Sequence, residues 1–114
     1  MVYPRKVTGF FYAGADVALQ TIVAPAANTN GVIVTSAGMH VITDNTRARV
    51  MAKASAPTSV DDSTALTLCI GGYGLIKPTL VSSMPCVLPP GVGLYAQKSD
   101  ANAGATYFCD YEVL

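Results

Sequence analysis

The chain has 114 residues and a mass of 11.8 kDa, which is the size of one typical domain. Hydrophobic residues make up 51% of it and charged residues only 12%, a low charged fraction for a soluble domain. These values exclude intrinsic disorder and a charged coiled coil, and the zero formal net charge argues against a nucleic-acid partner held by phosphate neutralisation. We expect a single domain over residues 1–114, with residues 1–6 as an N-terminal arm.

The low charge also bears on assembly. Seven acidic and seven basic side chains give a free monomer of this size an unusually low surface charge density. Either uncharged polar side chains solvate the surface, or much of the surface is buried against other chains. The apolar composition favours the second explanation, so we expect permanent assembly.

No segment of the sequence has the features of a targeting signal. No apolar run of signal-peptide length follows the basic pair near the N-terminus, and the most apolar stretch, 86–96, is interrupted by prolines and glycines. No run reaches the roughly 20 apolar residues of a membrane span. We expect synthesis in a cytoplasm, no signal peptide and no membrane partner.

Local propensity favours strands along the whole chain. Thr and Val are abundant, Gly and Pro separate short runs, and no window has sustained helical periodicity. The segment 75–85 gives no clear prediction. The expected strands, in chain order, cover residues 6–12, 17–23, 31–35, 39–43, 47–54, 65–70, 86–88, 94–98 and 105–114.

Three of these strands carry more specific expectations. In 47–54, long polar residues alternate with small apolar ones, which is typical of a half-exposed antiparallel strand. The run 65–70 reads as almost continuously buried. The last strand, 105–114, should lie inside a sheet, so truncation of the C-terminus should be costly.

The spacing of about eight to ten short strands, with no helical stretch between them, predicts an all-β fold. The expected architecture is an antiparallel β-sandwich that resembles a jelly roll. Its exposed loop tips should lie in residues 25–30, 55–63 and 99–104, where polar side chains gather. The candidate tip residues are Asn28, Asn30, Asp61, Asp62, Asp100 and Asn102.

His40 is the only imidazole and would be the base of any hydrolytic triad. Its nearest acid is Asp44, and the chain has no GxSxG nucleophile motif. We interpret His40 as a structural or surface residue. We therefore expect no catalytic site and no cofactor.

The remaining acidic residues also have ordinary explanations. Asp61 and Asp62 are adjacent in a polar loop, so their side chains should point apart. Asp110 and Glu112 should form cross-strand ion pairs with Arg47 or Arg49. The glycine-rich segments 71–74 and 91–93 lack the phosphate-loop pattern and are interpreted as turns.

The cysteines and tyrosines favour packing roles. Cys69, Cys86 and Cys109 are widely spaced and lie in apolar runs, which predicts buried free thiols. The sequence leaves a disulfide and a three-thiolate metal site open, but nothing in the spacing favours a metal. The six tyrosines suit a core or a subunit interface better than a carbohydrate-stacking platform.

Two segments together resemble a known class of proteins. A proline–glycine turn, 89–95 (PPGVGLY), precedes the closing strand 107–114 (YFCDYEVL), and 28–34 reads NTNGVIV. With this order of turn and strand segments, the chain resembles small all-β structural proteins of tailed-bacteriophage virions, such as capsid decoration proteins, head-fibre proteins and tail or baseplate modules. The chain differs in its three cysteines and lacks a collagen-like or coiled-coil trimerisation segment.

The resemblance implies a non-enzymatic role in the virion. It implies a decoration or cement protein that stabilises the assembled head shell, works as a homotrimer and contacts the major capsid protein or other virion proteins. The alternative is a tail or baseplate module that binds a carbohydrate receptor. The N-terminal arm is a candidate contact with the capsid or another partner through Val2, Tyr3, Pro4, Arg5 and Lys6.

Overall fold

The computed structural model describes residues 9–13, 18–41, 47–71, 79–82, 86–99 and 104–114. These residues form β-strands and one short 3-10 helix, η1 (Pro25–Ala27), with no α-helix among them. The strands are β1 (Gly9–Ala13), β2 (Leu19–Val23), β3 (Val32–Val41), β4 (Ala48–Lys53), β5 (Leu66–Gly71), β6 (Thr79–Ser82), β7 (Cys86–Leu88), β8 (Gly93–Lys98) and β9 (Ala105–Val113).

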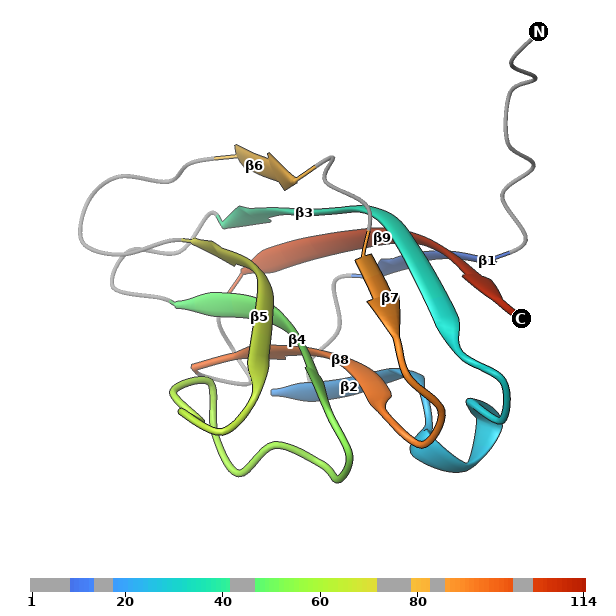
Figure 1. Cartoon of the computed structure of the whole chain (residues 1–114). Helices are drawn as coiled ribbons and strands as arrows, with labels where there is room; N and C mark the ends of the chain where they lie inside the picture. The colour runs from blue at the N-terminus through green and yellow to red at the C-terminus, as the bar shows by residue number, and fades with distance from the viewer. Residues whose placement is uncertain (1–8, 14–17, 42–46, 72–78, 83–85, 100–103) are drawn as a thin grey trace, which may run out of the picture.

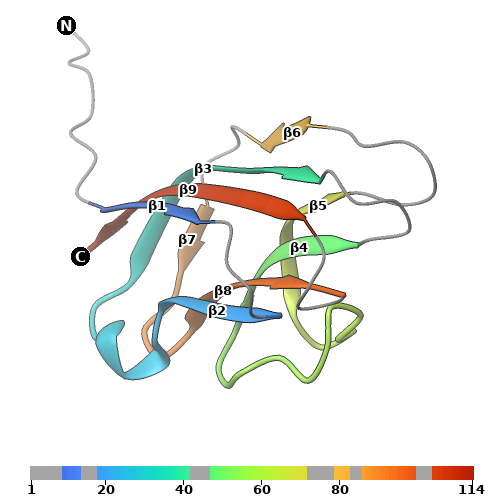
Figure 2. The same ribbon diagram turned by 180° about the vertical axis from the view of Figure 1, so that it is seen from behind.

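The strands form two antiparallel sheets packed against each other (Figures 1 and 2). Sheet A has the order β1-β9-β3-β6, and β7 pairs with the same side of β3 as β6. Sheet B has the order β2-β8-β4-β5. The predicted all-β sandwich is therefore confirmed.

The pairing is that of a jelly roll. The first half of the chain runs antiparallel to the second half, because β1 pairs with β9, β2 with β8, β3 with β6 and β7, and β4 with β5. Rolling this long hairpin adds the pairs β9–β3 and β8–β4. The jelly-roll expectation is thus met by the strand order itself.

The core lies between the sheets. In the strands whose side chains are described, alternate residues point inward, as the pleat requires. Sheet B contributes mainly small side chains, including Ala48, Val50 and Ala96, while sheet A contributes Met39 and Tyr107. Small residues opposite large ones let the two sheets interdigitate.

The prediction of two strands over 31–35 and 39–43 is wrong. The chain forms the single strand β3, which stays paired with β9 from Val32 to Val41. The irregularity expected at 36–38 appears instead as a register shift between Val34 and Ser36. Pairing on both sides of β3 holds the strand together where local propensity is weak.

The prediction of almost continuous burial for 65–70 is also wrong. Leu66 is 57% exposed and Ile70 is 54% exposed. The reason is position, because β5 is an edge strand of sheet B and its alternate side chains reach solvent. The expectation for the last strand is confirmed, since β9 lies between β1 and β3.

Candidate functional site

The long connection between β4 and β5 folds back over the outer face of sheet B. A second small hydrophobic cluster forms there, in which Met51, Tyr95 and Ala65 are buried and Leu19 packs beside them. The outer side of β4 was predicted to be half-exposed, and this prediction is wrong: Arg49 and Met51 are buried. The connection covers them.

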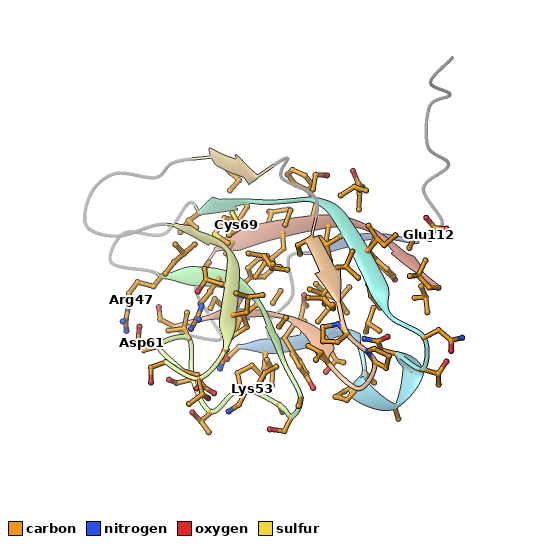
Figure 3. All side chains as sticks on the ribbon, viewed as in Figure 1. Arg47, Lys53, Asp61, Cys69 and Glu112 are labelled. Atoms are coloured by element: carbon orange, nitrogen blue, oxygen red, sulfur yellow. The ribbon has the colours of Figure 1, made fainter. Side chains whose placement is uncertain are left out.

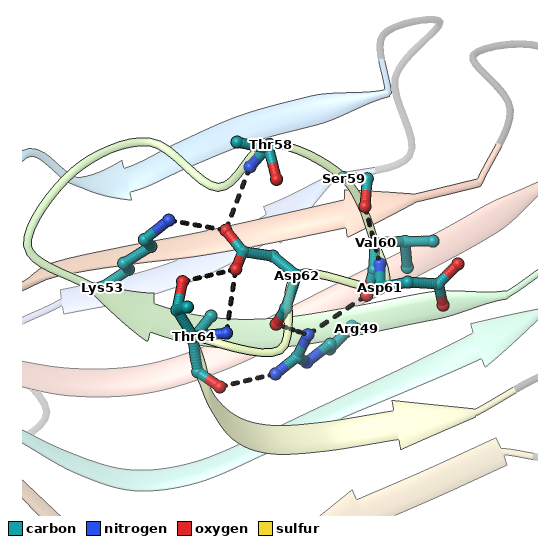
Figure 4. A network of polar contacts seen from close by, with 9 residues as sticks. Arg49, Lys53, Thr58, Ser59, Val60, Asp61, Asp62 and Thr64 are labelled. Carbon is teal, nitrogen blue, oxygen red and sulfur yellow. Dashed lines mark hydrogen bonds and ion pairs between the residues drawn. The ribbon is translucent and has the colours of Figure 1, made fainter.

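Arg49 anchors this connection (Figure 4). Its guanidinium donates to the backbone carbonyls of Val60 (3.2 Å), Asp62 (2.7 Å) and Ala65 (2.7 Å). Its Nε donates to Thr67 Oγ1 at 2.7 Å. One buried cation thus fixes the connection at three points along its backbone and ties it to β5.

Asp62 supplies the reciprocal anchor (Figure 4). Its carboxylate accepts from Lys53 Nζ at 2.7 Å and from the backbone amides of Thr58 and Thr64 at 3.1 and 2.9 Å. The Thr64 hydroxyl donates to it as well. The Lys53 contact, followed by the hydrogen bonds from the two threonines, holds the pKa of Asp62 well below its ordinary value.

Asp61 points to a different partner, so the expectation that the adjacent aspartates diverge is confirmed. Asp61 forms an exposed ion pair with Arg47 beside sheet B, whereas Glu112 lies on sheet A at the other end of the molecule (Figure 3). The predicted pairing of Asp110 and Glu112 with Arg47 or Arg49 is therefore wrong, because β9 and β4 belong to different sheets.

A second polar anchor joins two loops at one end of the sandwich. The side-chain amide of Asn28 donates to the carbonyls of Pro89 (2.8 Å) and Val92 (2.9 Å). Its Oδ1 accepts from the Gly31 amide at 2.7 Å, and its carbonyl accepts from the Gly91 amide at 2.8 Å. The turns before β3 and before β8 are thereby locked together.

These anchors correct two of the predicted loop tips. Asn28 is only 2% exposed and Asp62 only 7%, because Asn28 bonds backbone groups of its own loop and of the loop before β8, and Asp62 bonds backbone amides of its own loop. Asn30 and Asp61 are exposed, as expected of loop tips. Asp100 and Asn102 lie outside the described residues, and so does the candidate arm, Val2, Tyr3, Pro4, Arg5 and Lys6.

The described residues bring together no cluster suited to hold a metal ion. His40 is exposed on sheet A, and Asp44 lies outside the described part of the chain. None of the three cysteines forms a disulfide: Cys69 and Cys109 are buried, while Cys86 is half-buried. Burial, with smaller contributions from Asp110 and Cys86, raises the pKa of Cys109 to about 12.

The charges of the strands have an unusual distribution. The edge strands β1, β2, β5, β6 and β7 contain no charged residue, whereas β4, β8 and β9, inside the sheets, contain all the charged residues of the described strands. Soluble β-proteins usually place charges, especially Lys, on their edge strands to prevent pairing with other chains. The edges here are short and two have register shifts, but the charges are missing.

The outer face of sheet A differs from that of sheet B, because no described element lies over it (Figures 1 and 2). Tyr107 and Cys109 point into the core, so the alternate residues Phe108 and Asp110 point outward. Asp110 accepts a hydrogen bond from the Ser36 hydroxyl at 2.8 Å. Gly38 pairs with Phe108 on the neighbouring strand.

Comparison with known proteins gives no relative: no family model, no curated protein and no solved structure matches the chain. The described residues include no helix of the length and apolarity needed to cross a bilayer. The function must therefore be argued from the sheet edges, the sheet faces and the anchored loops.

Proposed function

We propose that this chain is a structural virion protein of a tailed bacteriophage. In this role it is a decoration or cement protein that binds and stabilises the assembled head shell as a homotrimer. The observation that carries the proposal is the absence of charge from every described edge strand of the jelly roll. Such edges suit a chain whose edge strands are covered by other subunits in the functional assembly.

Two further observations support an assembly subunit. Jelly rolls recur in viral capsid and lectin domains, although a fold alone does not define a function. Asn28 fixes the loops at one end of the sandwich, and Arg49 and Asp62 fix the connection that covers sheet B. Because these loops are ordered before contact, binding through them costs little conformational entropy.

The mechanism is stabilisation by mass action. A protein that binds the assembled shell, and has no affinity for its separated subunits, raises the stability of the shell in proportion to the logarithm of its own free concentration. The proposed contacts are the arm, Val2–Lys6, and the exposed loop residues Asn30 and Asp61.

The test uses empty, expanded heads of the phage that encodes the chain. We expect saturable co-sedimentation of the purified protein with the heads and a higher melting temperature of the loaded heads. A variant lacking residues 1–6 should bind the heads at least about tenfold more weakly, while Leu114→Ala serves as the matched control. Protein that stays in the supernatant and leaves the melting temperature unchanged would overturn the proposal.

The second candidate is a tail or baseplate module that binds a carbohydrate receptor. The observation that favours it is the outer face of sheet A, over which no described element lies and where Phe108 lies among Ser36, Thr106 and Asp110. An aromatic ring surrounded by hydroxyl and carboxylate groups suits a sugar, which stacks on the ring and hydrogen-bonds around its rim. Binding of the oligomer to host cells or purified host polysaccharide, with loss in Phe108→Ala, would favour this candidate over the cement protein.

A further inference from the structure

One side of the sandwich is formed by the edges of both sheets. It consists of β5 from sheet B and of β6 and β7 from sheet A, and we call it the β5–β7 side. β5 lies beside β6 across the gap between the sheets, although the two strands do not pair. Each of the three strands has one ladder partner, β4 or β3, among the described strands.

The strands of the β5–β7 side carry most of the large exposed apolar side chains of the described residues. Three of the five belong to these strands, namely Leu66, Ile70 and Val87. Ile70 pairs with Arg49 and faces out of sheet B, whereas Val87 pairs with Ile33 and faces out of sheet A, so the two flank this side from opposite faces of the sandwich. Val87, at 65%, is the most exposed of the five. The other two, Val113 and Leu114, lie at the C-terminus next to Asn30 and Glu112. Burial of apolar surface is the main driving force of association.

The described strands of this side carry no charged residue. β5, β6 and β7 have no acidic or basic residue, so two identical copies can approach without placing like charges opposite each other. These strands offer no charged side chain that could recognise a charged partner. A second copy brings a surface of the same chemistry.

The state of the free protein before it meets a shell also favours a second copy as the partner. A shell-binding surface must stay exposed in the free protein before a shell is available, and uncharged edge strands with exposed apolar side chains would then favour aggregation. A surface covered permanently by another subunit avoids this. From these observations we infer that the β5–β7 side binds a second copy of this chain, an inference that rests on the proposed role as a homo-oligomer.

The test places a lysine in the contact. Ile70→Lys and Val87→Lys change side chains that already face solvent, and a lysine on an edge strand is common in soluble β-proteins, so both variants should fold. The matched control is Val113→Lys, an exposed apolar residue away from this side. Light scattering at two protein concentrations measures the mass, and circular dichroism verifies the fold.

We expect an oligomeric wild type and an oligomeric Val113→Lys protein, and a fall to monomer mass in Ile70→Lys and Val87→Lys. Mixing complementary variants then identifies the arrangement. Recovery of mass when Ile70→Lys meets Ile70→Glu indicates β5 against β5, and recovery when it meets Val87→Glu indicates β5 against β7. If a lysine variant loses its native spectrum, Ile70→Thr, which keeps a β-branched side chain, replaces it.

The inference is overturned if the wild type is a monomer at both concentrations. It is also overturned if folded lysine variants keep the mass of the wild type. The test is separate from that of the proposed function, because an oligomer that dissociates as expected but ignores phage heads would reject the cement role alone. A monomer that stabilises heads would reject this inference together with the homotrimer, and would leave the cement role itself standing.

Discussion

Replacing Arg49 by Met should detach the connection between β4 and β5 from sheet B. Methionine keeps an unbranched apolar side chain over the sheet but removes the four hydrogen bonds that the guanidinium donates. The carbonyls of Val60, Asp62 and Ala65 then lose their charged donor. The contact between Ala65 and Met51 should loosen with them.

The size of the effect follows from the carbonyls that are left without a partner. The Asp62 carbonyl keeps the hydrogen bond from the Ala65 amide at 3.3 Å, so the loss falls on the carbonyls of Val60 and Ala65. A buried polar group left without a partner costs about 1–3 kcal/mol. Because the connection lies at the surface, these carbonyls can turn toward water, so the lower value applies to each and the total is about 2 kcal/mol. For a chain of this size the entropy of unfolding is about 0.24 kcal/mol/K, so the melting temperature should fall by about 8 °C.

The assay is thermal unfolding at a fixed protomer concentration, because association shifts the melting temperature. Arg47→Met is the matched control, since it removes the same side chain from an exposed ion pair with Asp61. That variant should lose less than about 1 kcal/mol. Equal losses in the two variants, or a loss below about 1 kcal/mol in Arg49→Met, would refute the anchoring role.

Three further perturbations test the loops. Asn28→Ala removes the side-chain contacts to Pro89, Val92 and Gly31 and should cost about 2–4 kcal/mol in urea unfolding; a loss no larger than that of exposed Asn30→Ala would contradict it. The folded-state pKa of Asp62 lies below its ordinary 3.8, so its contribution is present above that pH and is lost as the pH falls toward the folded-state pKa. Asp62→Asn should therefore flatten stability against pH below pH 4, and an unchanged slope would count against this carboxylate. Gly93→Ala would place a Cβ 2.8 Å from the Tyr95 ring and 2.9 Å from Pro25, costing about 1–3 kcal/mol, whereas Gly91→Asn, in open space at φ +85°, should cost less than about 1 kcal/mol.

Much of the fold could be predicted because strand patterns are local. The alternation of long and small residues in β4, and the glycine and proline turns around β7 and β8, are read directly from neighbouring residues. These signals place β4, β5, β7, β8 and β9 close to their observed bounds, but they divide β3 into two strands and do not predict β6. They do not say which strands pair, since pairing joins residues far apart in the chain.

The anchors could not be predicted for the same reason. Asn28 forms hydrogen bonds with residues 61 and 64 positions away. Nothing in the neighbouring sequence distinguishes it from another loop asparagine. The sequence shows Arg49 only as a long residue on an expected strand, and Asp62 only as an acid in the loop that follows it. Only the return of that loop over sheet B places them together, and this return converts an expected exposed face into a buried one.

The exposure of β5 also depends on context. Its run of apolar residues suits a central strand, and nothing within the run indicates that it lies at an edge. The position becomes informative only with the strand order, because an apolar edge strand is a hazard for a free protein while the same residues in a central strand are ordinary packing.

In the described strands, Arg49 and Lys53 hold the β4–β5 connection to sheet B, while the edge strands carry no charge. Arg49 and Lys53 lie in β4, where burial is tolerated because the returning connection supplies oxygen partners. No comparable charge protects β5, β6 or β7. Solubility of the protein should therefore depend on association rather than on surface charge: diluting the oligomer below its dissociation range should promote aggregation, and Ile70→Lys should remain a soluble monomer there. If the wild type instead dilutes to a soluble monomer, uncharged polar groups alone suffice to protect these edges.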